Sequence, residues 1–327
     1  MYIPFNHTAV SRLALALVFT VPAMRAHADV VDPESLFIEM NKAAGSLNYQ
    51  GIFVYGHSNK VDTKTIKVVH IRDKGAEFEQ YTLLNGENRT ITRKNDQVYC
   101  PFPGGKGLRL HRLRFSSGDP RETIATMKKH YRFEMAKHDR VAGRECNVVS
   151  IVPNDNLRYG YKLWIDKQSK MLMRTDVVDS GKIVEQMMFA ELKFINNPAE
   201  IPRPKHRKVK RRASIQKPGP QKPKWHMDLP PGFFLAEQKL VHENHQSLEH
   251  MIYTDGIASV SVFLEIQHPK LNSPPEHNPF IKDAISLGAI NAVAIPQDQL
   301  RRNITVVGEV PALTVQKIAA SIKQVDP

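Results

Sequence analysis

RYGYKLWID-KQSK-MLMRTDVV-DSGK-IVEQMMFAELKF, residues 158–194, contains three apolar runs separated by two polar tetrads. The runs are rich in aromatic, β-branched and methionine residues, and the tetrads have the composition of turns. Short runs of this kind between polar turns are typical of antiparallel strands joined by hairpins. The stretch therefore predicts a three-stranded antiparallel meander.

The first and third runs differ in how their apolar residues are spaced. In the first run, Tyr159, Tyr161, Leu163 and Ile165 occupy alternate positions, which predicts one apolar face. In the third run, residues 187–189 (MMF) are consecutive, so that strand is covered on both faces or lines a cavity. Methionine adapts well to irregular apolar surfaces. A curved sheet with such an apolar surface indicates a ligand-binding protein rather than an enzyme.

The first 28 residues are predicted to be a signal peptide. Arg12 precedes the short apolar run LALALVFTV, and Ala26-His27-Ala28 fits a small-x-small cleavage site. An anchoring helix is the weaker alternative, because the run is too short to span a bilayer. We expect export with cleavage after Ala28. The residue directly after that site is Asp29 rather than Cys, so a lipid anchor is not indicated.

The distribution of charge divides the rest of the chain. The 327 residues are 41% apolar with a formal net charge of +13, and ten of the positive charges fall within residues 203–224, which contain no Asp or Glu. This Pro-rich segment cannot bury a core. We therefore predict a first domain over residues 29–198, a basic linker over 199–224 and a second domain over 225–327.

The basic linker has three interpretations. It is a solvated spacer, or it attracts anionic membrane lipid or phosphorylated glycolipid, or it binds nucleic acid. Export and the lack of aromatic residues among the charges argue against nucleic acid. The candidate contacts to an anionic headgroup are Arg207, Lys208, Lys210, Arg211 and Arg212.

In the first domain, capping patterns predict two helices among many short strands. Asp32-Pro33 begins a helix that continues to Leu47, and Asp119-Pro120 begins another that ends near His130. Strands are predicted over residues 48–55, 65–71, 78–84, 89–92, 97–100, 133–135 and 146–152, with turns at Asn85-Gly86, 94–96 and 139–144. The expected architecture is α+β, with helices packed on one curved antiparallel sheet.

The second domain is predicted to be a smaller α+β unit. Residues 228–233 form a turn into a strand, residues 251–265 form a hairpin that turns at Asp255-Gly256, and residues 304–307 form a further strand. A helix begins at Pro311, and its apolar face contains Val315, Ile318, Ala319 and Ile322.

Sequence motifs for catalysis or cofactors are absent. The chain has no CxxC, HExxH, GxGxxG or nucleophile elbow, and residues 104–107 (GGKG) lack the Ser/Thr of a phosphate loop. His242, His245 and His250 match no metal template and fit a polar loop or helix face better. Cys100 and Cys146 could form a disulfide or be two buried apolar side chains. We expect no enzymatic activity and no cofactor.

Seven segments together resemble one family. They are residues 47–55 (LNYQGIFVY), 139–144 (DRVAGR), 157–166 (LRYGYKLWID), 185–189 (EQMMF), 229–233 (LPPGF), 253–263 (YTDGIASVSVF) and 306–311 (VVGEVP). In these segments and their order the chain resembles the RseB/MucB family, periplasmic regulators of the envelope-stress sigma factor sigma-E, which implies that this protein is exported to the periplasm. The match covers nearly the whole chain after the signal peptide.

This resemblance implies a fold and a function. The first domain would be a half-open antiparallel β-barrel like that of the lipoprotein carriers, accepting acyl chains such as those of lipopolysaccharide. The second would help to bind the periplasmic region of a membrane-spanning anti-sigma factor and shield it from proteolysis until lipid releases it. The candidate lipid-binding residues are Phe53, Tyr55, Leu163, Ile165, Met187 and Phe189. The candidate partner-binding residues are Tyr253, Asp255, Val260 and Val262.

A second function remains open from the sequence. The protein would be a periplasmic lipid or lipoprotein carrier without an anti-sigma partner. The second domain argues against this alternative, because a simple carrier needs none. Self-association into a homo-oligomer is also left open.

Overall fold

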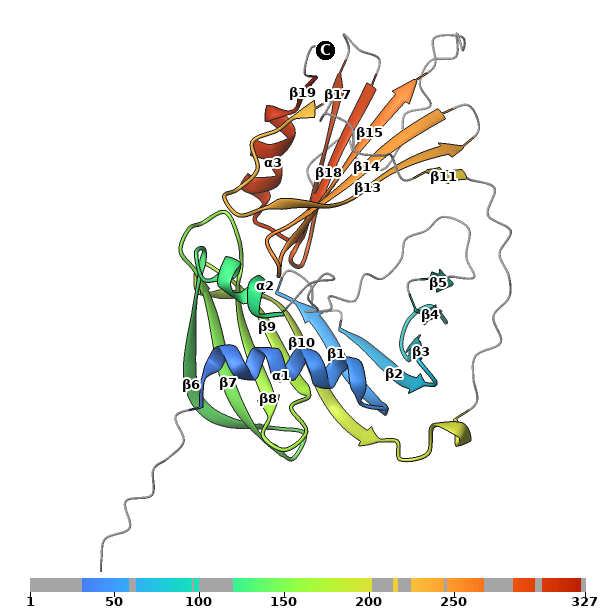
Figure 1. Ribbon diagram of the computed structural model, residues 1–327, viewed down its shortest axis with the longest axis vertical. Helices are drawn as coiled ribbons and strands as arrows, with labels where there is room; N and C mark the ends of the chain where they lie inside the picture. The colour runs from blue at the N-terminus through green and yellow to red at the C-terminus, as the bar shows by residue number, and fades with distance from the viewer. Residues whose placement is uncertain are drawn as a thin grey trace, which may run out of the picture. The chain divides into compact units, whose positions relative to one another are not determined.

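The computed structural model describes residues 31–58, 63–95, 97–99, 120–201, 214–216, 225–243, 246–267, 285–297 and 302–324. Among these residues, the strands fall into one large sheet in the first half of the chain and another in the second half (Figure 1). We call the first sheet with its two helices the first module, and the second sheet with its helix the second module.

The first sheet is antiparallel and open. Its ten strands are ordered β5-β4-β3-β2-β1-β10-β9-β8-β7-β6, so β5 and β6 are edges and the sheet does not close. This confirms the prediction of a half-open barrel. The strands are β1 (Tyr49–His57), β2 (Lys64–Asp73), β3 (Ala76–Leu83), β4 (Thr90–Lys94), β5 (Gln97–Tyr99), β6 (Tyr131–Val141), β7 (Arg144–Pro153), β8 (Gly160–Asp166), β9 (Leu172–Asp179) and β10 (Lys182–Phe194).

Two-residue turns with positive φ join several of these strands. Ala142-Gly143 joins β6 to β7 and Ser180-Gly181 joins β9 to β10, with φ between 48° and 81° in both turns. Such turns match the twist of a hairpin. The predicted turns in DRVAGR and DSGK are therefore confirmed, as is the meander β8-β9-β10.

The predicted turn at Asn85-Gly86 is confirmed in position, because antiparallel β3 and β4 flank it, but it is not a two-residue hairpin turn. β3 ends at Leu83 and β4 begins at Thr90, so the connection is longer. The Asn85 side chain accepts a hydrogen bond from the Thr65 amide (2.7 Å) and donates to the Thr63 carbonyl (2.6 Å). Asn85 thus pairs with the beginning of β2, a contact between segments that local turn propensity does not reveal.

Two helices pack against the first sheet. α1 (Pro33–Ser46) begins as predicted, because the Asp32 side chain accepts the Ser35 amide at 2.9 Å, and it crosses the sheet (Figure 1). α2 (Pro120–Met127) ends earlier than predicted. Alternate residues of β7 and β8 lie in separate apolar clusters, which means that both faces of the sheet are covered. A 3-10 turn, η1 (Pro198–Glu200), follows β10.

The second module is the smaller α+β unit that was expected. Its sheet has the order β11-β13-β14-β15-β18-β17-β16, and β12 pairs separately with β19. The elements are β11 (Ser214–Gln216), β12 (Trp225–His226), β13 (Phe234–Glu243), β14 (Gln246–Thr254), β15 (Ser259–Gln267), β16 (Ile285–Leu287), β17 (Ile290–Gln297), β18 (Arg302–Gly308), α3 (Ala312–Ser321) and β19 (Lys323–Gln324). α3 packs on β17 and β18 through the predicted face, because Val315, Ile318, Ala319 and Ile322 are all buried.

Parts of the linker and histidine predictions need correction. Ser214–Gln216 pairs with β13 and so belongs to the second sheet, since these residues carry neither Pro nor charge. His242 and His250 lie in the paired strands β13 and β14, rather than in a loop or on a helix. The exact domain boundaries stay predictions. No helix among the described residues is long and apolar enough to cross a membrane.

Two further predictions rest on residues that are not described. The signal peptide and Cys100 lie outside the described residues, so cleavage and the Cys100–Cys146 disulfide stay predictions. Cys146 itself is buried in β7, and burial raises the pKa of its thiol to about 11.

Candidate binding site: an apolar cluster and a junction between the modules

Four of the six predicted lipid-binding residues lie together on β1 and β10. Phe53 is opposite Phe189 in the register and Tyr55 is opposite Met187. The rings of Phe53 and Phe189 meet edge to face at 5.7 Å. Phe53 and Phe189 are buried, whereas Tyr55 and Met187 are half-buried. We call Phe53, Tyr55, Met187 and Phe189 the apolar cluster.

The other two predicted residues belong elsewhere. Leu163 and Ile165 on β8 are fully buried in a different group, together with Leu36, Phe37 and Met40 of α1. The six residues therefore do not form one pocket. The reason is that α1 covers the face of β8 to which the alternating pattern assigned Leu163 and Ile165.

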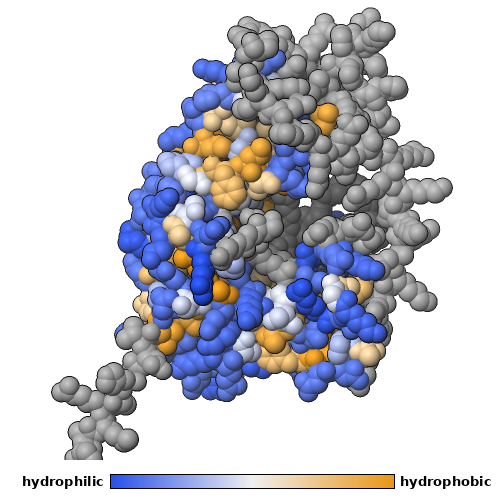
Figure 2. All heavy atoms as spheres, viewed as in Figure 1, coloured by the Kyte–Doolittle hydropathy of each residue, from blue (hydrophilic) through white to orange (hydrophobic). Residues whose placement is uncertain are grey.

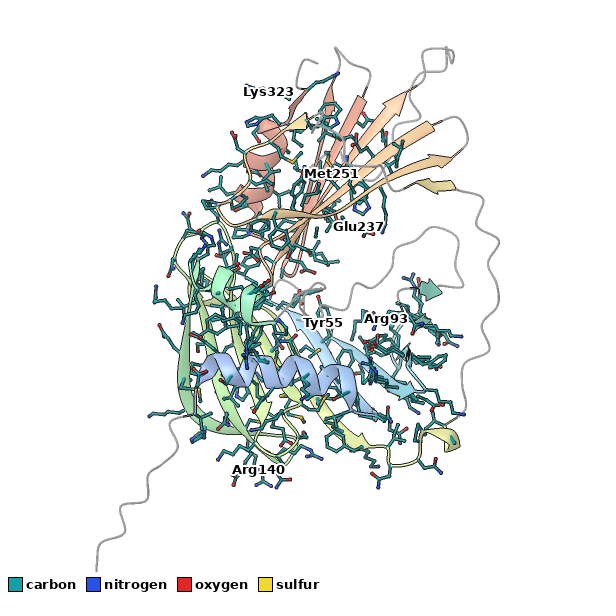
Figure 3. The ribbon with its side chains drawn as sticks, in the orientation of Figure 1. Tyr55, Arg93, Arg140, Glu237, Met251 and Lys323 are labelled. Atoms are coloured by element: carbon teal, nitrogen blue, oxygen red, sulfur yellow. The ribbon has the colours of Figure 1, made fainter. Side chains whose placement is uncertain are left out.

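The apolar cluster leads directly to the second module. The ring of Tyr55, which Figure 3 labels on β1, meets the ring of His57 edge to face at 5.7 Å. Burial raises the pKa of Tyr55, and the neighbouring Glu185 carboxylate raises it further. Glu185 Oε2 accepts the buried amide of Ala289 in the β16–β17 turn at 3.1 Å. One carboxylate thus contacts both the apolar cluster and the other module.

A buried ion pair forms the second part of this junction. Arg158 Nη1 donates to Asp255 Oδ2 at 2.8 Å, and the two side chains are 0% and 1% exposed. The Tyr131 hydroxyl donates to the same oxygen at 2.8 Å, while Arg158 also donates to the Pro231 carbonyl at 2.7 Å. Burial and the Asp255 carboxylate raise the pKa of Tyr131. The pair satisfies both charges within the protein, as a buried pair requires.

Asp255 also shapes its own loop. Its Oδ1 accepts the amides of Ile257 and Ala258 at 3.1 and 2.9 Å. The predicted hairpin at Asp255-Gly256 is confirmed in position, but its loop contains four residues, because β14 ends at Thr254 and β15 begins at Ser259. This loop presents Ile257 to the core of the first module.

Neutral polar contacts complete the junction. Asn291 on β17 donates to the Tyr159 hydroxyl at 2.9 Å and to the Val310 carbonyl at 2.8 Å. The Thr314 hydroxyl at the start of α3 donates to the Leu157 carbonyl at 2.9 Å. Ile257 and Ala289 of the second module are buried among the apolar residues of the first. The two modules therefore share a buried, hydrogen-bonded interface in addition to the linker.

The predicted partner-binding residues are mostly inside the protein. Val260 and Val262 are 0% exposed in the core of the second sheet, and Asp255 belongs to the junction. They present no surface to a partner in this arrangement, because their alternating apolar pattern marks the core face of β15. Tyr253 is half-buried and lies opposite Leu235 in the register.

Several large apolar side chains of the second module are exposed instead. Phe234 and Leu235 at the start of β13 are 47% and 46% exposed, and Ile285 and Leu287 on β16 are 47% and 44% exposed. Figure 2 shows hydrophobic side chains gathered in separate patches among hydrophilic ones on the face in view. Exposed apolar residues of this kind are candidates for contact with a partner.

A cavity of about 590 Å³ lies beside α3. Apolar and charged residues line it, and they are Leu157, His226, Asp228, Leu229, Pro230, Pro231, Thr314, Lys317, Ile318, Ala320, Ser321 and Lys323. The predicted lipid-binding residues are not among them. The basic residues Arg207, Lys208, Lys210, Arg211 and Arg212 lie outside the described residues. Among the described residues, His70, Glu77 and Glu79 are placed to hold a metal ion.

The fold and the junction define a class of two-module binding proteins, in which an open antiparallel sheet covered by helices contacts a smaller α+β module. The family model of the MucB/RseB N-terminal domain matches residues 32–211, and that of the C-terminal domain matches residues 219–323. The chain therefore belongs to the MucB/RseB family.

Individual relatives agree with this assignment. The chain is 28% identical to the Sigma factor AlgU regulatory protein MucB of Pseudomonas aeruginosa, covering 95% of this chain and 96% of that protein. It is 27% identical to the Sigma-E factor regulatory protein RseB of Salmonella typhimurium, with 96% of each chain covered. A crystal structure of MucB in complex with MucA(peri) shares the fold, with a TM-score of 0.67, 24% identity and coverage of 90% of this chain and 100% of that one.

Proposed function

We propose that this protein is a periplasmic regulator of the envelope-stress sigma factor. It binds the periplasmic region of a membrane-spanning anti-sigma factor, shields that region from proteolysis, and releases it when an acyl lipid such as lipopolysaccharide binds the first module. The mechanism is non-enzymatic. The relatives named as sigma factor regulatory proteins and the MucB complex with MucA(peri) support this role.

The observation that carries the proposal is the double contact of Glu185. This carboxylate lies beside Tyr55 of the apolar cluster and accepts the Ala289 amide of the second module. A lipid changes partner affinity only if it favours one arrangement of the protein over another. An acyl chain that displaces Tyr55 or Met187 also disturbs Glu185, and through Glu185 it disturbs the junction.

The partner surface is assigned to exposed apolar residues of the second module. Leu235 and Tyr253 lie opposite each other in the register at the beginning of β13 and form the proposed surface, and the exposed Phe234 precedes Leu235 on the other face of the strand. Apolar anchors of this size commonly provide much of the energy at an interface.

The experiment measures affinity for the purified periplasmic region of the organism's own anti-sigma factor. We expect binding, at least a tenfold weaker Kd in saturating lipopolysaccharide, and about tenfold weaker binding by Leu235→Glu, the equivalent of about 1.4 kcal/mol. The matched control is Leu313→Glu, since Leu313 on α3 is 49% exposed and lies outside the proposed surface. Failure of the wild-type protein to bind would overturn the proposed function. Equal effects of Leu235→Glu and Leu313→Glu on the Kd would show that Leu235 does not lie on the partner surface.

The basic linker is proposed to attract the anionic headgroup of the lipid. Each Lys or Arg near an anionic surface contributes about 1 kcal/mol, and salt screens this attraction. We expect the replacement of Arg207, Lys208, Lys210, Arg211 and Arg212 by Gln to weaken lipopolysaccharide binding and its dependence on salt. An unchanged salt dependence would contradict this role.

The alternative function, a lipid or lipoprotein carrier, is distinguished by capture of partners. Pull-down of the tagged protein from the periplasm, followed by mass spectrometry, should recover an anti-sigma fragment. Recovery of mature lipoproteins without that fragment would favour the carrier. Light scattering of the same sample would determine whether the protein forms a homo-oligomer.

A further inference from the structure

His70 on β2 has one ring nitrogen fixed by the backbone. The His70 side chain is 0% exposed, its ring stacks on that of Tyr49 at 5.1 Å, and its Nδ1 lies 2.7 Å from the Leu47 carbonyl oxygen. A carbonyl only accepts hydrogen bonds, so Nδ1 carries the proton. The lone pair of the neutral imidazole is therefore on Nε2.

That lone pair faces two carboxylates on β3. Nε2 lies 3.1 Å from Glu77 Oε1 and 4.0 Å from Glu79 Oε1, and the Glu79 side chain is 1% exposed. A nitrogen lone pair and a carboxylate oxygen repel each other at 3.1 Å unless a proton or a metal ion lies between them. Either a proton on this pair or a metal ion satisfies the contact, and Arg93 Nη2 already donates to the same Glu77 oxygen at 2.7 Å.

We propose that His70, Glu77 and Glu79 form a zinc site. Their donor atoms all lie within 4.8 Å of one another. Zinc bonds of about 2.0–2.2 Å place tetrahedral ligand atoms roughly 3.3–3.6 Å apart, so on binding zinc the 3.1 Å His70–Glu77 pair would open slightly and the 4.0 Å His70–Glu79 pair would close. One imidazole and two carboxylates form a donor set of the kind zinc accepts, with a water as the fourth ligand.

The surroundings are those of a supported metal site. Histidine ligands usually donate the other ring N–H to a carbonyl or carboxylate, as His70 does to Leu47. Arg93 on β4, labelled in Figure 3, donates to Glu77 Oε1 at 2.7 Å and to Glu79 Oε2 at 2.9 Å, which fixes both carboxylates. Bound zinc would tie β2 and β3 to the residue that follows α1.

The experiment measures zinc in the purified protein after chelation and dialysis against micromolar zinc. Elemental analysis should find about one zinc per chain in the wild type and less than a fifth of that in the isosteric Glu79→Gln. Zinc at about 100 times its Kd should raise the thermal unfolding midpoint of the wild type by about 5 °C. The midpoint of Glu79→Gln should not change when zinc is added. Circular dichroism checks that the variant folds, and the more exposed Glu77→Gln replaces it if it does not.

The matched control is His250→Gln. His250 also stacks on a ring, Phe263 at 4.2 Å, and bonds Ser261 at 3.2 Å, but it lies in the second sheet. We expect His250→Gln to keep its zinc. Loss of zinc from this variant with retention in Glu79→Gln would place the metal at the histidines of β13 and β14. Either that result or a wild type without zinc, with only a proton at His70, overturns the proposal.

Discussion

Asp255 shows how one side chain holds both a loop and an interface. Oδ1 bonds the amides of Ile257 and Ala258, and Oδ2 bonds Arg158 and Tyr131. Asp255→Asn keeps an oxygen for the loop but removes the charge, which leaves Arg158 buried without its full counter-charge. Breaking a buried pair costs about 3–5 kcal/mol, but Arg158 keeps the Asp155 carboxylate 3.1 Å from its Nε, so we expect a loss at the lower end, about 3 kcal/mol, in the free energy of unfolding, measured with urea.

An exposed pair supplies the control for Asp255→Asn. Arg132 and Glu134 are 58% and 52% exposed, with 3.4 Å between their charged atoms. We expect Glu134→Gln to change the free energy of unfolding by less than about 1 kcal/mol. If the two variants are equally stable, then the Arg158–Asp255 pair does not hold the junction.

Three buried tyrosines predict how stability depends on alkaline pH. Burial raises the pKa of Tyr159 to about 12, and burial raises the pKa values of Tyr131 and Tyr161 well above their usual range. The folded protein keeps these phenols protonated, so their contribution to stability is complete below about pH 10 and is lost as the pH rises through the folded-state pKa values.

The measurement is the ultraviolet absorbance of phenolate at about pH 11, one unit above the usual tyrosine pKa. Unfolding by guanidinium at that pH should ionise these three tyrosines, and Tyr159→Phe should remove about a third of the signal that they contribute. A native protein whose tyrosines all titrate near pH 10 would contradict the burial at the junction.

At the scale of the element, the β16–β17 turn determines how closely the modules approach. Gly288 has φ +61°, and a Cβ there would lie 2.7 Å from Glu185 Oε2. Gly181 in the β9–β10 turn has φ +81°, with nothing within 4 Å of an added Cβ. Both alanine variants strain the backbone, so the difference between them measures the clash.

We therefore expect Gly288→Ala to lower the unfolding midpoint more than Gly181→Ala, and to speed protease cleavage of the linker. Differential scanning calorimetry and limited proteolysis measure these effects. Equal midpoints would mean that the Glu185–Ala289 approach contributes nothing to stability.

Local elements were predictable where their causes are local. The Asp32 cap, the turns at 142–143 and 180–181, and the buried face of α3 follow from short-range patterns, and the structure confirms them. The length of the connection at Asn85-Gly86 was not predictable in this way, because Asn85 bonds Thr63, just before β2, and Thr65 on β2. Family resemblance, rather than periodicity, predicted the half-open barrel.

At the scale of the whole molecule, the junction was beyond sequence reasoning. Arg158, Glu185 and Asn291 look like ordinary surface residues in the sequence, and only the packing of the modules buries them. Arg158 and Glu185 did lie in segments that resemble the family, which was the one available signal. Val260 and Val262 were candidate partner-binding residues through the family resemblance, whereas the structure places both in the core of the second sheet.

Communication between the apolar cluster and the second module is tested most directly by hydrogen exchange at the Ala289 amide. This amide is buried and bonded to Glu185 in the protein without lipid. If lipid acts through Tyr55 and Glu185, saturating lipopolysaccharide should accelerate exchange at Ala289 at least tenfold, while the core amide of Val306 on β18 is unchanged. Unchanged exchange at Ala289, with protection gained only around Phe53 and Phe189, would contradict the account.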